Sequence, residues 1–154
     1  MPGIIVSDTS CLILLDKLGR IDLLKSLFNK VTITGIIADE FGKELPDFIE
    51  IRNPQEKNYQ RILESFLDSG EASAFALAIE NNDCLLIIDD LKARREAKQL
   101  KLNFTGTIGI LILAIEKGYI ENVSVLIDEI KGTNFRISEK YIDEIKRRFN
   151  KLKF

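Results

Sequence analysis

Three short runs of aliphatic and β-branched residues punctuate the chain, at positions 3–7, 31–34 and 84–89. Their apolar residues are continuous rather than alternating, which is the pattern of strands that are covered on both faces. We therefore expect these strands to be parallel members of one sheet. A fourth short strand is expected within 102–107, whereas the stretch FIEIR at 48–52 is ambiguous.

Apolar residues between these runs recur at the spacing of a helix. The segments expected to be helical are 11–18, 21–28, 36–45, 59–67, 71–79, 93–100 and 108–116, followed after Tyr119 by two amphipathic segments at 122–132 and 138–149. Strands that alternate with helices predict an α/β fold, here a three-layer arrangement in which helices wrap a parallel sheet. We expect a single domain over 1–154, with a C-terminal helical extension around 138–154.

Composition supports one globular domain, because 154 residues with 45% apolar and 30% charged side chains can bury a sizeable core. The longest apolar stretch, near 108–115, is too short to span a bilayer, and no secretory signal pattern stands at the N-terminus. We therefore expect a cytoplasmic protein that has no membrane partner.

Histidine is absent from the chain, which excludes Ser-His and Cys-His nucleophilic pairs. Cys11 and Cys84 lie within apolar runs and lack CxxC spacing, so we expect buried free thiols rather than a zinc site or a disulfide. Catalysis in this chain would have to depend on carboxylates, lysine, hydroxyl groups or a metal.

Acidic residues stand where the predicted strands end. Asp8 follows the first strand, and Asp89 and Asp90 follow the strand at 84–89, while Glu40 and Glu71 lie on helices that begin nearby. In an open parallel sheet, ligands bind at the carboxyl ends of strands, so these acids are expected at one edge. Carboxylates gathered in this way repel one another, and a divalent cation such as Mg²⁺ or Mn²⁺ would remove the conflict.

Each of these acids also has a structural explanation when taken alone. Asp8 can accept hydrogen bonds from free amides at a helix start, Glu71 can complement a helix dipole, and Glu40 can be solvated. The hydroxyl groups of Thr9, Ser10 and Thr107 can orient the acids or their water, or can cap helices. The group of acids is therefore more informative than any one of them.

Local charge differs from the formal net charge of −2. Basic residues cluster in LKARREAKQLK at 91–101 and in KRRFNKLK at 146–153. A solvated helix face and a charged tail explain these clusters as well as a nucleic-acid contact does. If the first cluster contacts nucleic acid, Arg94 and Arg95 are the candidates, because they follow Asp90 on the predicted helix.

Several motifs together resemble those of the PIN domain nucleases, in particular the toxin-type branch of toxin–antitoxin systems. The motifs are VSDTSCLILL, IADEFGKEL, LDSGEASAFALA, LLIIDDLKARREA and GTIGILILA, which extend over nearly the whole chain. The resemblance implies a PIN-like sheet with metal-binding acids gathered at one end. The residues that occupy the acidic positions of the family are Asp8, Glu40, Glu71 and Asp90, with Asp89 as the alternative to Asp90.

The chain departs from the family pattern at two positions. Lys92 stands where a further acid is often found, which argues against a second metal ion and places a cation where it can contact phosphate. Cys11 stands where a small residue or proline is common, and we expect it to pack in the core.

The expected activity is metal-dependent hydrolysis of RNA phosphodiester bonds. Asp8 and Asp90 would anchor Mg²⁺ or Mn²⁺, Glu71 would complete the site, and Glu40 would bind the attacking water. The resemblance also implies a small antitoxin as partner and a homodimer.

Two alternatives remain open. A catalytically inactive PIN-like module could bind RNA or protein on the same scaffold, because a fold does not guarantee activity. A receiver-like phosphoacceptor domain also gathers acids at strand ends, but it needs the acid pair after the first strand, and here the pair follows a later one.

Overall fold

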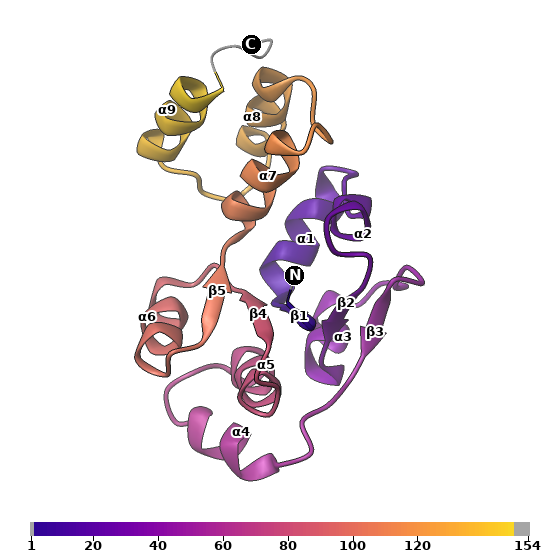
Figure 1. Cartoon of the computed structure of the whole chain (residues 1–154), viewed down its shortest axis with the longest axis vertical. Coiled ribbons are helices and arrows are strands. Elements are labelled where there is room, and N and C mark those ends of the chain that lie inside the picture. The colour runs from indigo at the N-terminus through magenta and orange to yellow at the C-terminus, as the bar shows by residue number, and fades with distance from the viewer. Residues whose placement is uncertain (1, 150–154) are drawn as a thin grey trace.

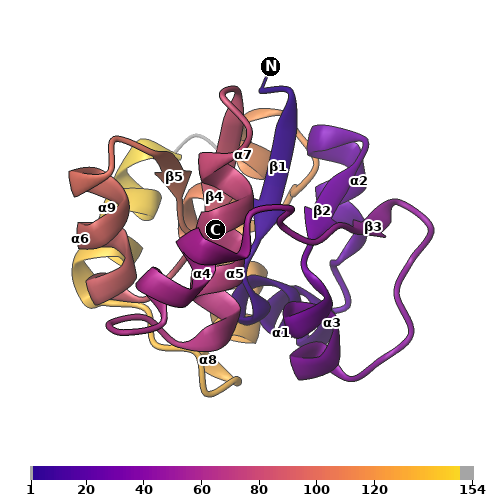
Figure 2. The ribbon, with the colours of Figure 1, turned by 90° about the horizontal axis from the view of Figure 1, so that it is seen from below.

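The computed structural model describes residues 2–149 and shows a five-stranded sheet in which every pairing is parallel. Residue 1 and residues 150–154 lie outside the described residues, and with them the ends of the basic segment 146–153 and of the expected extension 138–154. The strands are β1 (Ile4–Ser7), β2 (Val31–Ile33), β3 (Ile49–Ile51), β4 (Cys84–Ile87) and β5 (Asn103–Thr105). Their order across the sheet is β3-β2-β1-β4-β5, which Figure 2 shows from one end.

The central position of β1 decides where the site forms. β1 pairs with β2 on one side through Val6 and Thr32, and with β4 on the other along its whole length. Residues of β2 and most residues of β1 and β4 are buried whichever way they point, so both faces of the sheet are covered. The prediction of a parallel α/β fold is therefore confirmed.

Helices cover these faces and connect the strands. They are α1 (Thr9–Lys17), α2 (Asp22–Phe28), α3 (Gly35–Phe41), α4 (Lys57–Leu63), α5 (Ser69–Ile79), α6 (Leu91–Gln99), α7 (Thr107–Glu116), α8 (Val123–Lys131) and α9 (Glu139–Arg148). The small, apolar helix α5 packs against β1 and β4, α2 packs against β2, and α6 packs against β5. Figure 1 shows α7, α8 and α9 gathered at one end of the molecule.

Two predicted helices are wrong in their bounds. The helix expected at 36–45 ends at Phe41, because Gly42 adopts a left-handed conformation (φ 69°) that terminates α3. The helix expected at 59–67 begins earlier and ends at Leu63, after which the chain turns toward α5. The ambiguous stretch 48–52 forms the edge strand β3, and the strand expected within 102–107 is β5.

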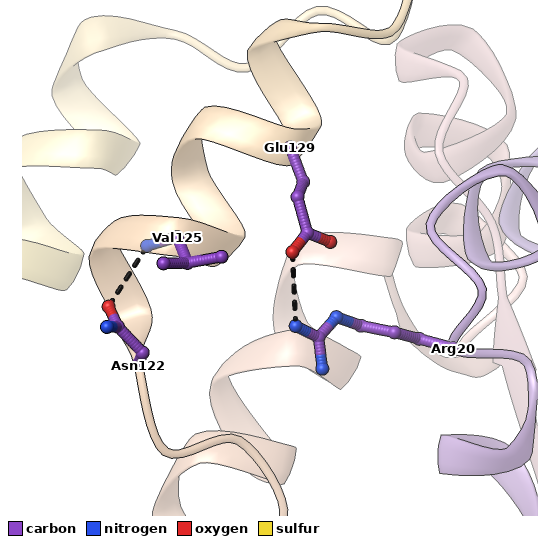
Figure 3. Close-up of polar contacts among 4 residues, drawn as sticks. All are labelled: Arg20, Asn122, Val125 and Glu129. Atoms are coloured by element: carbon purple, nitrogen blue, oxygen red, sulfur yellow. Dashed lines mark hydrogen bonds and ion pairs between the residues drawn. The ribbon is translucent and has the colours of Figure 1, made fainter.

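An ion pair connects α8 to the N-terminal half of the chain, and a local hydrogen bond caps its start. Figure 3 shows Arg20 Nη2 3.4 Å from Glu129 Oε1, and Asn122 Oδ1 accepting a hydrogen bond from the backbone N–H of Val125 at 3.1 Å. Asn122 thereby caps the start of α8. These contacts fix the helix that leads into the C-terminal segment.

Both cysteines are buried and free, as predicted from their apolar surroundings, and Cys11 is part of the core. Within residues 2–149, none of the helices combines the length and apolar character needed to cross a membrane.

Candidate functional site

Asp8 lies where β1 passes into α1, and its carboxylate is buried. Asp8 Oδ1 accepts a hydrogen bond from the backbone N–H of Cys11 at 2.9 Å, which caps α1. Asp8 Oδ2 accepts from the backbone N–H of Asp89 at 3.0 Å, which connects the end of β1 to the end of β4. One carboxylate thus joins two neighbouring strand ends at the carboxyl edge of the sheet.

The electrostatic environment of Asp8 disfavours its charged form. Burial, followed by the negative charge of Asp89 and more weakly that of Glu71, raises the pKa of Asp8 to about 7. The two backbone hydrogen bonds oppose this increase but do not cancel it. Asp8 therefore takes up a proton more readily than an ordinary aspartate unless a positive charge approaches.

Glu71 lies in the first turn of α5 and has a similar environment. Its pKa rises to about 7 because of partial burial and the negative charges of Asp68 and Asp90. Asp68 is the N-cap of α5 and accepts a hydrogen bond from the backbone N–H of Glu71 at 2.8 Å. Capping therefore brings a second carboxylate beside Glu71.

The acids from β1, α3 and α5 share one pocket of about 290 Å³, which we call the acid pocket. It is lined by Asp8, Thr9, Ser10, Ile13, Glu40, Asp68, Gly70 and Glu71. Of the four acids predicted at the site, the structure brings three into this pocket.

Glu40 reaches the acid pocket from the last turn of α3 and is exposed. Thr9 Oγ1 donates a hydrogen bond of 2.6 Å to Glu40 Oε1, which fixes the direction of the glutamate side chain. A Cβ atom at Gly70 would collide with the same oxygen, so the glycine leaves room for this carboxylate. Thr9 and Gly70 together determine where Glu40 lies.

Asp90 and Asp89 lie beside the acid pocket rather than among the residues that line it. Asp90 is exposed and caps α6 by accepting from the backbone N–H of Ala93 at 3.0 Å, and its charge acts on Glu71. Asp89 accepts two hydrogen bonds from Thr107, one from the backbone N–H at 2.8 Å and one from Oγ1 at 2.5 Å. Thr107 therefore holds Asp89 next to Asp8.

Asp68 was not predicted from the sequence as a residue of the site, although its spacing from Glu71 indicates a helix N-cap. Asp68 and Glu71 have the D-x-x-E spacing of a capping box, in which the first residue caps the helix and the fourth lies beside it. This helix was expected at 71–79, whereas α5 begins at Ser69, and its N-cap was therefore overlooked. The position of Gly70 against Glu40 had no sequence signal, because it depends on how α3 and α5 pack.

The acids act on one another electrostatically without forming a compact cluster. Among residues 2–149, no three of them are close enough together to hold one metal ion. Their assignment as ligands and catalytic groups thus stays a prediction for Asp8, Glu40, Glu71 and Asp90.

The candidate RNA contacts on α6 differ in their surroundings. Lys92 and Arg95 are exposed. Arg94 is half-buried, with its guanidinium carbon 5.4 Å from the centroid of the Phe104 ring, and it lines a second pocket together with Asp89. Arg94 therefore lies in the same pocket as Asp89, an acid of the site.

Comparison with known proteins places this arrangement in a family. The profile of the DUF3368 family, whose members are PIN domains, matches residues 4–151. No curated protein matches the chain. PIN domains are generally nucleases, and the acid pocket lies at the carboxyl edge of a parallel sheet, which is where such a fold binds ligands. The chain therefore belongs to the DUF3368 family of PIN domains.

Proposed function

We propose that this protein is a divalent-metal-dependent endoribonuclease that hydrolyses phosphodiester bonds of RNA in the acid pocket. The observation that carries the proposal is the convergence of Asp8, Glu40 and Glu71 on one pocket at the carboxyl edge of the sheet. Burial and neighbouring carboxylates raise the pKa of Asp8 and of Glu71 there. Perturbed carboxylates of this kind concentrate at functional sites. The PIN family supports nuclease chemistry, since its members generally act on nucleic acid and use divalent metals.

The donor chemistry of the site suits Mg²⁺ or Mn²⁺, because such an ion keeps several waters and needs only one or two carboxylates rather than a compact set of three. Carboxylate oxygens are the hard ligands that these ions prefer, and the repulsion among Asp8, Asp89 and Glu71 is a conflict that a cation relieves. Asp8 and Asp90 are the residues proposed to hold the ion, and Glu71 is proposed to complete the site. When bound, a divalent cation supplies Lewis acidity that lowers the pKa of water and offsets charge on the phosphate.

The side chains of the pocket have separate proposed roles in hydrolysis. Glu40 binds and orients the water that attacks phosphorus, and Thr9 holds the Glu40 carboxylate in place by its hydrogen bond. Ser10 adds a second hydroxyl at the same wall of the pocket. Thr107 fixes Asp89, whose backbone N–H in turn fixes Asp8. The attack of water on phosphorus breaks one P–O bond and leaves a phosphate on one fragment and a hydroxyl group on the other.

The biological setting that we propose is a toxin–antitoxin pair, in which the nuclease acts as a homodimeric toxin and a small antitoxin protein occupies its cleft. This setting depends on the motif resemblance to the toxin-type branch of PIN domains. We also propose that the chain acts as a single PIN-like domain over 1–154, with a C-terminal helical extension around 138–154.

A cleavage assay with a fluorogenic single-stranded RNA tests the activity. Cleavage is expected with Mn²⁺, should stop with EDTA, and should fall at least a hundredfold in Asp8→Asn and Asp90→Asn. Asp39→Asn is the matched control, because Asp39 is an exposed acid next to Glu40 that does not line the acid pocket. Cleavage that resists EDTA, or that continues at the wild-type rate in Asp8→Asn, would exclude the proposal.

A catalytically inactive module that binds RNA or protein is the second candidate. It is favoured by the finding that, within residues 2–149, no three acids lie close enough together to hold one metal ion. Such a module would retard RNA in a mobility assay without cutting it under any metal condition. The cleavage assay therefore separates the two candidates directly.

A further inference from the structure

A second hollow of about 820 Å³ opens between α6 and α9, beside the acid pocket. We call it the α6–α9 groove; its main lining residues are Leu91 and Arg94 of α6, Ile108 of α7, Lys131 at the end of α8, Arg136 of the following loop and Tyr141 of α9. Figure 1 shows α6 and α9 on the same side of the molecule as β5. The nuclease chemistry proposed above makes no use of this groove.

Asp89 connects the groove to the acid pocket. Its side chain lines the groove, and its negative charge acts on Asp8, whose carboxylate accepts the hydrogen bond of the Asp89 backbone N–H. A polymer that lies in the groove would therefore continue directly toward Asp8.

The charge of the groove is opposite to that of the acid pocket. Arg94, Lys131 and Arg136 all line it, and none of the three forms an ion pair with another of residues 2–149. Asp89 and Glu139 are the acids in the same lining, and Asp89 accepts hydrogen bonds from Thr107. The exposed cations Lys131 and Arg136, together with Arg94, which stacks on Phe104, favour a ligand that carries negative charge.

The groove also exposes apolar surface of the kind that contacts bases. Leu91 is 71% exposed and Tyr141 is 44% exposed, although both are large apolar side chains. Ile108 and Phe135 contribute half-buried apolar surface beside them. Aromatic rings combined with cations form the surfaces on which single-stranded nucleic acids stack their bases and place their phosphates.

We propose that the α6–α9 groove binds the nucleotides of single-stranded RNA that flank the scissile phosphate, with a base stacked on Tyr141 and phosphates contacting Lys131 and Arg136. Arg94 lies at the passage toward Asp89 and contacts the phosphate nearest the acid pocket. This assignment rests on the proposed nuclease function and names the part of the substrate that the groove holds. A peptide or a second copy of the chain could also supply apolar groups and carboxylates, but the link between the groove and Asp8 through Asp89 favours the polymer that is cleaved in the acid pocket.

RNA binding measured in EDTA tests the groove without cleavage. A fluorescein-labelled 12-nucleotide single-stranded RNA would be titrated with each variant, and its anisotropy followed at several salt concentrations. Lys131→Ala/Arg136→Ala is expected to weaken binding about tenfold at low salt and to reduce the salt slope by about 1.4, which corresponds to two lost phosphate contacts. Tyr141→Ala is expected to weaken binding roughly fivefold or more with an unchanged salt slope, whereas Tyr141→Phe keeps the wild-type affinity.

Matched controls lie elsewhere on the surface. Tyr119 is 47% exposed and does not line the groove, so Tyr119→Ala should bind RNA as the wild type does. Lys25→Ala/Lys117→Ala controls for net charge. It removes as much positive charge as the groove double variant does, but from exposed residues that do not line the groove.

The possible results test the groove assignment and the nuclease proposal separately. If the groove variants bind and cleave RNA as the wild type does while Asp8→Asn is inactive, the groove assignment falls and the nuclease proposal stands. If the groove variants lose binding but no condition gives cleavage, the groove stands as a site for single-stranded RNA, and both the nuclease proposal and the placement of a scissile phosphate fall. The assignment would be overturned in favour of a protein interface if the groove variants keep the wild-type affinity for RNA and the protein self-associates in a way that Tyr141→Ala abolishes.

Discussion

Asp8 has a structural role and a proposed functional role in the same carboxylate. It caps α1 and fixes the end of β4, and its burial beside Asp89 raises its pKa at the same time. Asp68 and Asp90 likewise cap α5 and α6 while they act on Glu71. The structural explanation of these acids and the functional one are therefore compatible, because capping is what directs the carboxylates to this edge.

The pH dependence of stability tests the electrostatic conflict at Glu71. Its pKa is about 7 in the folded protein and near 4.5 in an unfolded chain, so the folded state holds more protons between these values. The unfolding free energy of the metal-free protein should therefore fall as the pH rises from about 4.5 to 7. Glu71→Gln removes this contribution, and its amide can still donate to Asp68. In EDTA, the Tm of Glu71→Gln should match the wild type near pH 4.5 and exceed it by a few degrees at pH 8.

Glu44→Gln serves as the control for this measurement, because Glu44 is exposed and does not line the acid pocket. A Tm difference between Glu71→Gln and the wild type that is the same at both pH values would contradict the assigned environment of Glu71.

At the scale of the elements, the start of α5 affects both the packing against the sheet and the charge of the acid pocket. The helix is almost wholly buried from Gly70 to Ala78, so its first turn cannot move without disturbing β1 and β4. The N-cap Asp68 stabilises that turn and also adds a negative charge to the acid pocket. The cap and the charge can be separated by mutation.

Asp68→Asn keeps a side-chain oxygen for the cap and removes the charge, whereas Asp68→Ala removes both. At pH 8 without metal, Asp68→Ala should be less stable than Asp68→Asn by about 1 kcal/mol, the usual contribution of an N-cap. Urea denaturation of the two variants measures this difference while their charge is the same. Equal midpoints for the two variants would show that the Asp68 side chain does not stabilise α5.

Elements were predictable from the sequence where local pattern and tertiary packing agree. The strands β1, β2 and β4 are continuous apolar runs, and they were located because strands buried on both faces require such runs. β3 was ambiguous because it is a three-residue edge strand with an exposed end, and its identity depends on pairing with β2. The order of the strands had no local signal at all.

At the scale of the whole molecule, the net charge of −2 conceals two regions of opposite sign. The candidate acids were found in the sequence because they directly follow strands or begin helices. The α6–α9 groove could not be found in this way, since Arg94, Lys131 and Tyr141 come from three helices whose packing brings them together. Only the tertiary structure shows that acidic and basic surfaces meet at Asp89.

Metal binding should couple these features to the stability of the whole protein. Asp8 and Glu71 have pKa values of about 7, so a divalent cation must displace protons from them, and its affinity should fall as the pH drops below 7. At pH 8, Mn²⁺ at about a hundred times its dissociation constant should add about 2.7 kcal/mol of stability, which corresponds to a Tm increase of roughly 5–10 °C. The same Mn²⁺ concentration at pH 5.5 should raise the Tm much less.

Asp8→Asn should abolish the increase at pH 8, whereas Asp39→Asn should retain it. An equal Mn²⁺ effect at both pH values, or one that persists in Asp8→Asn, would place the metal outside the acid pocket.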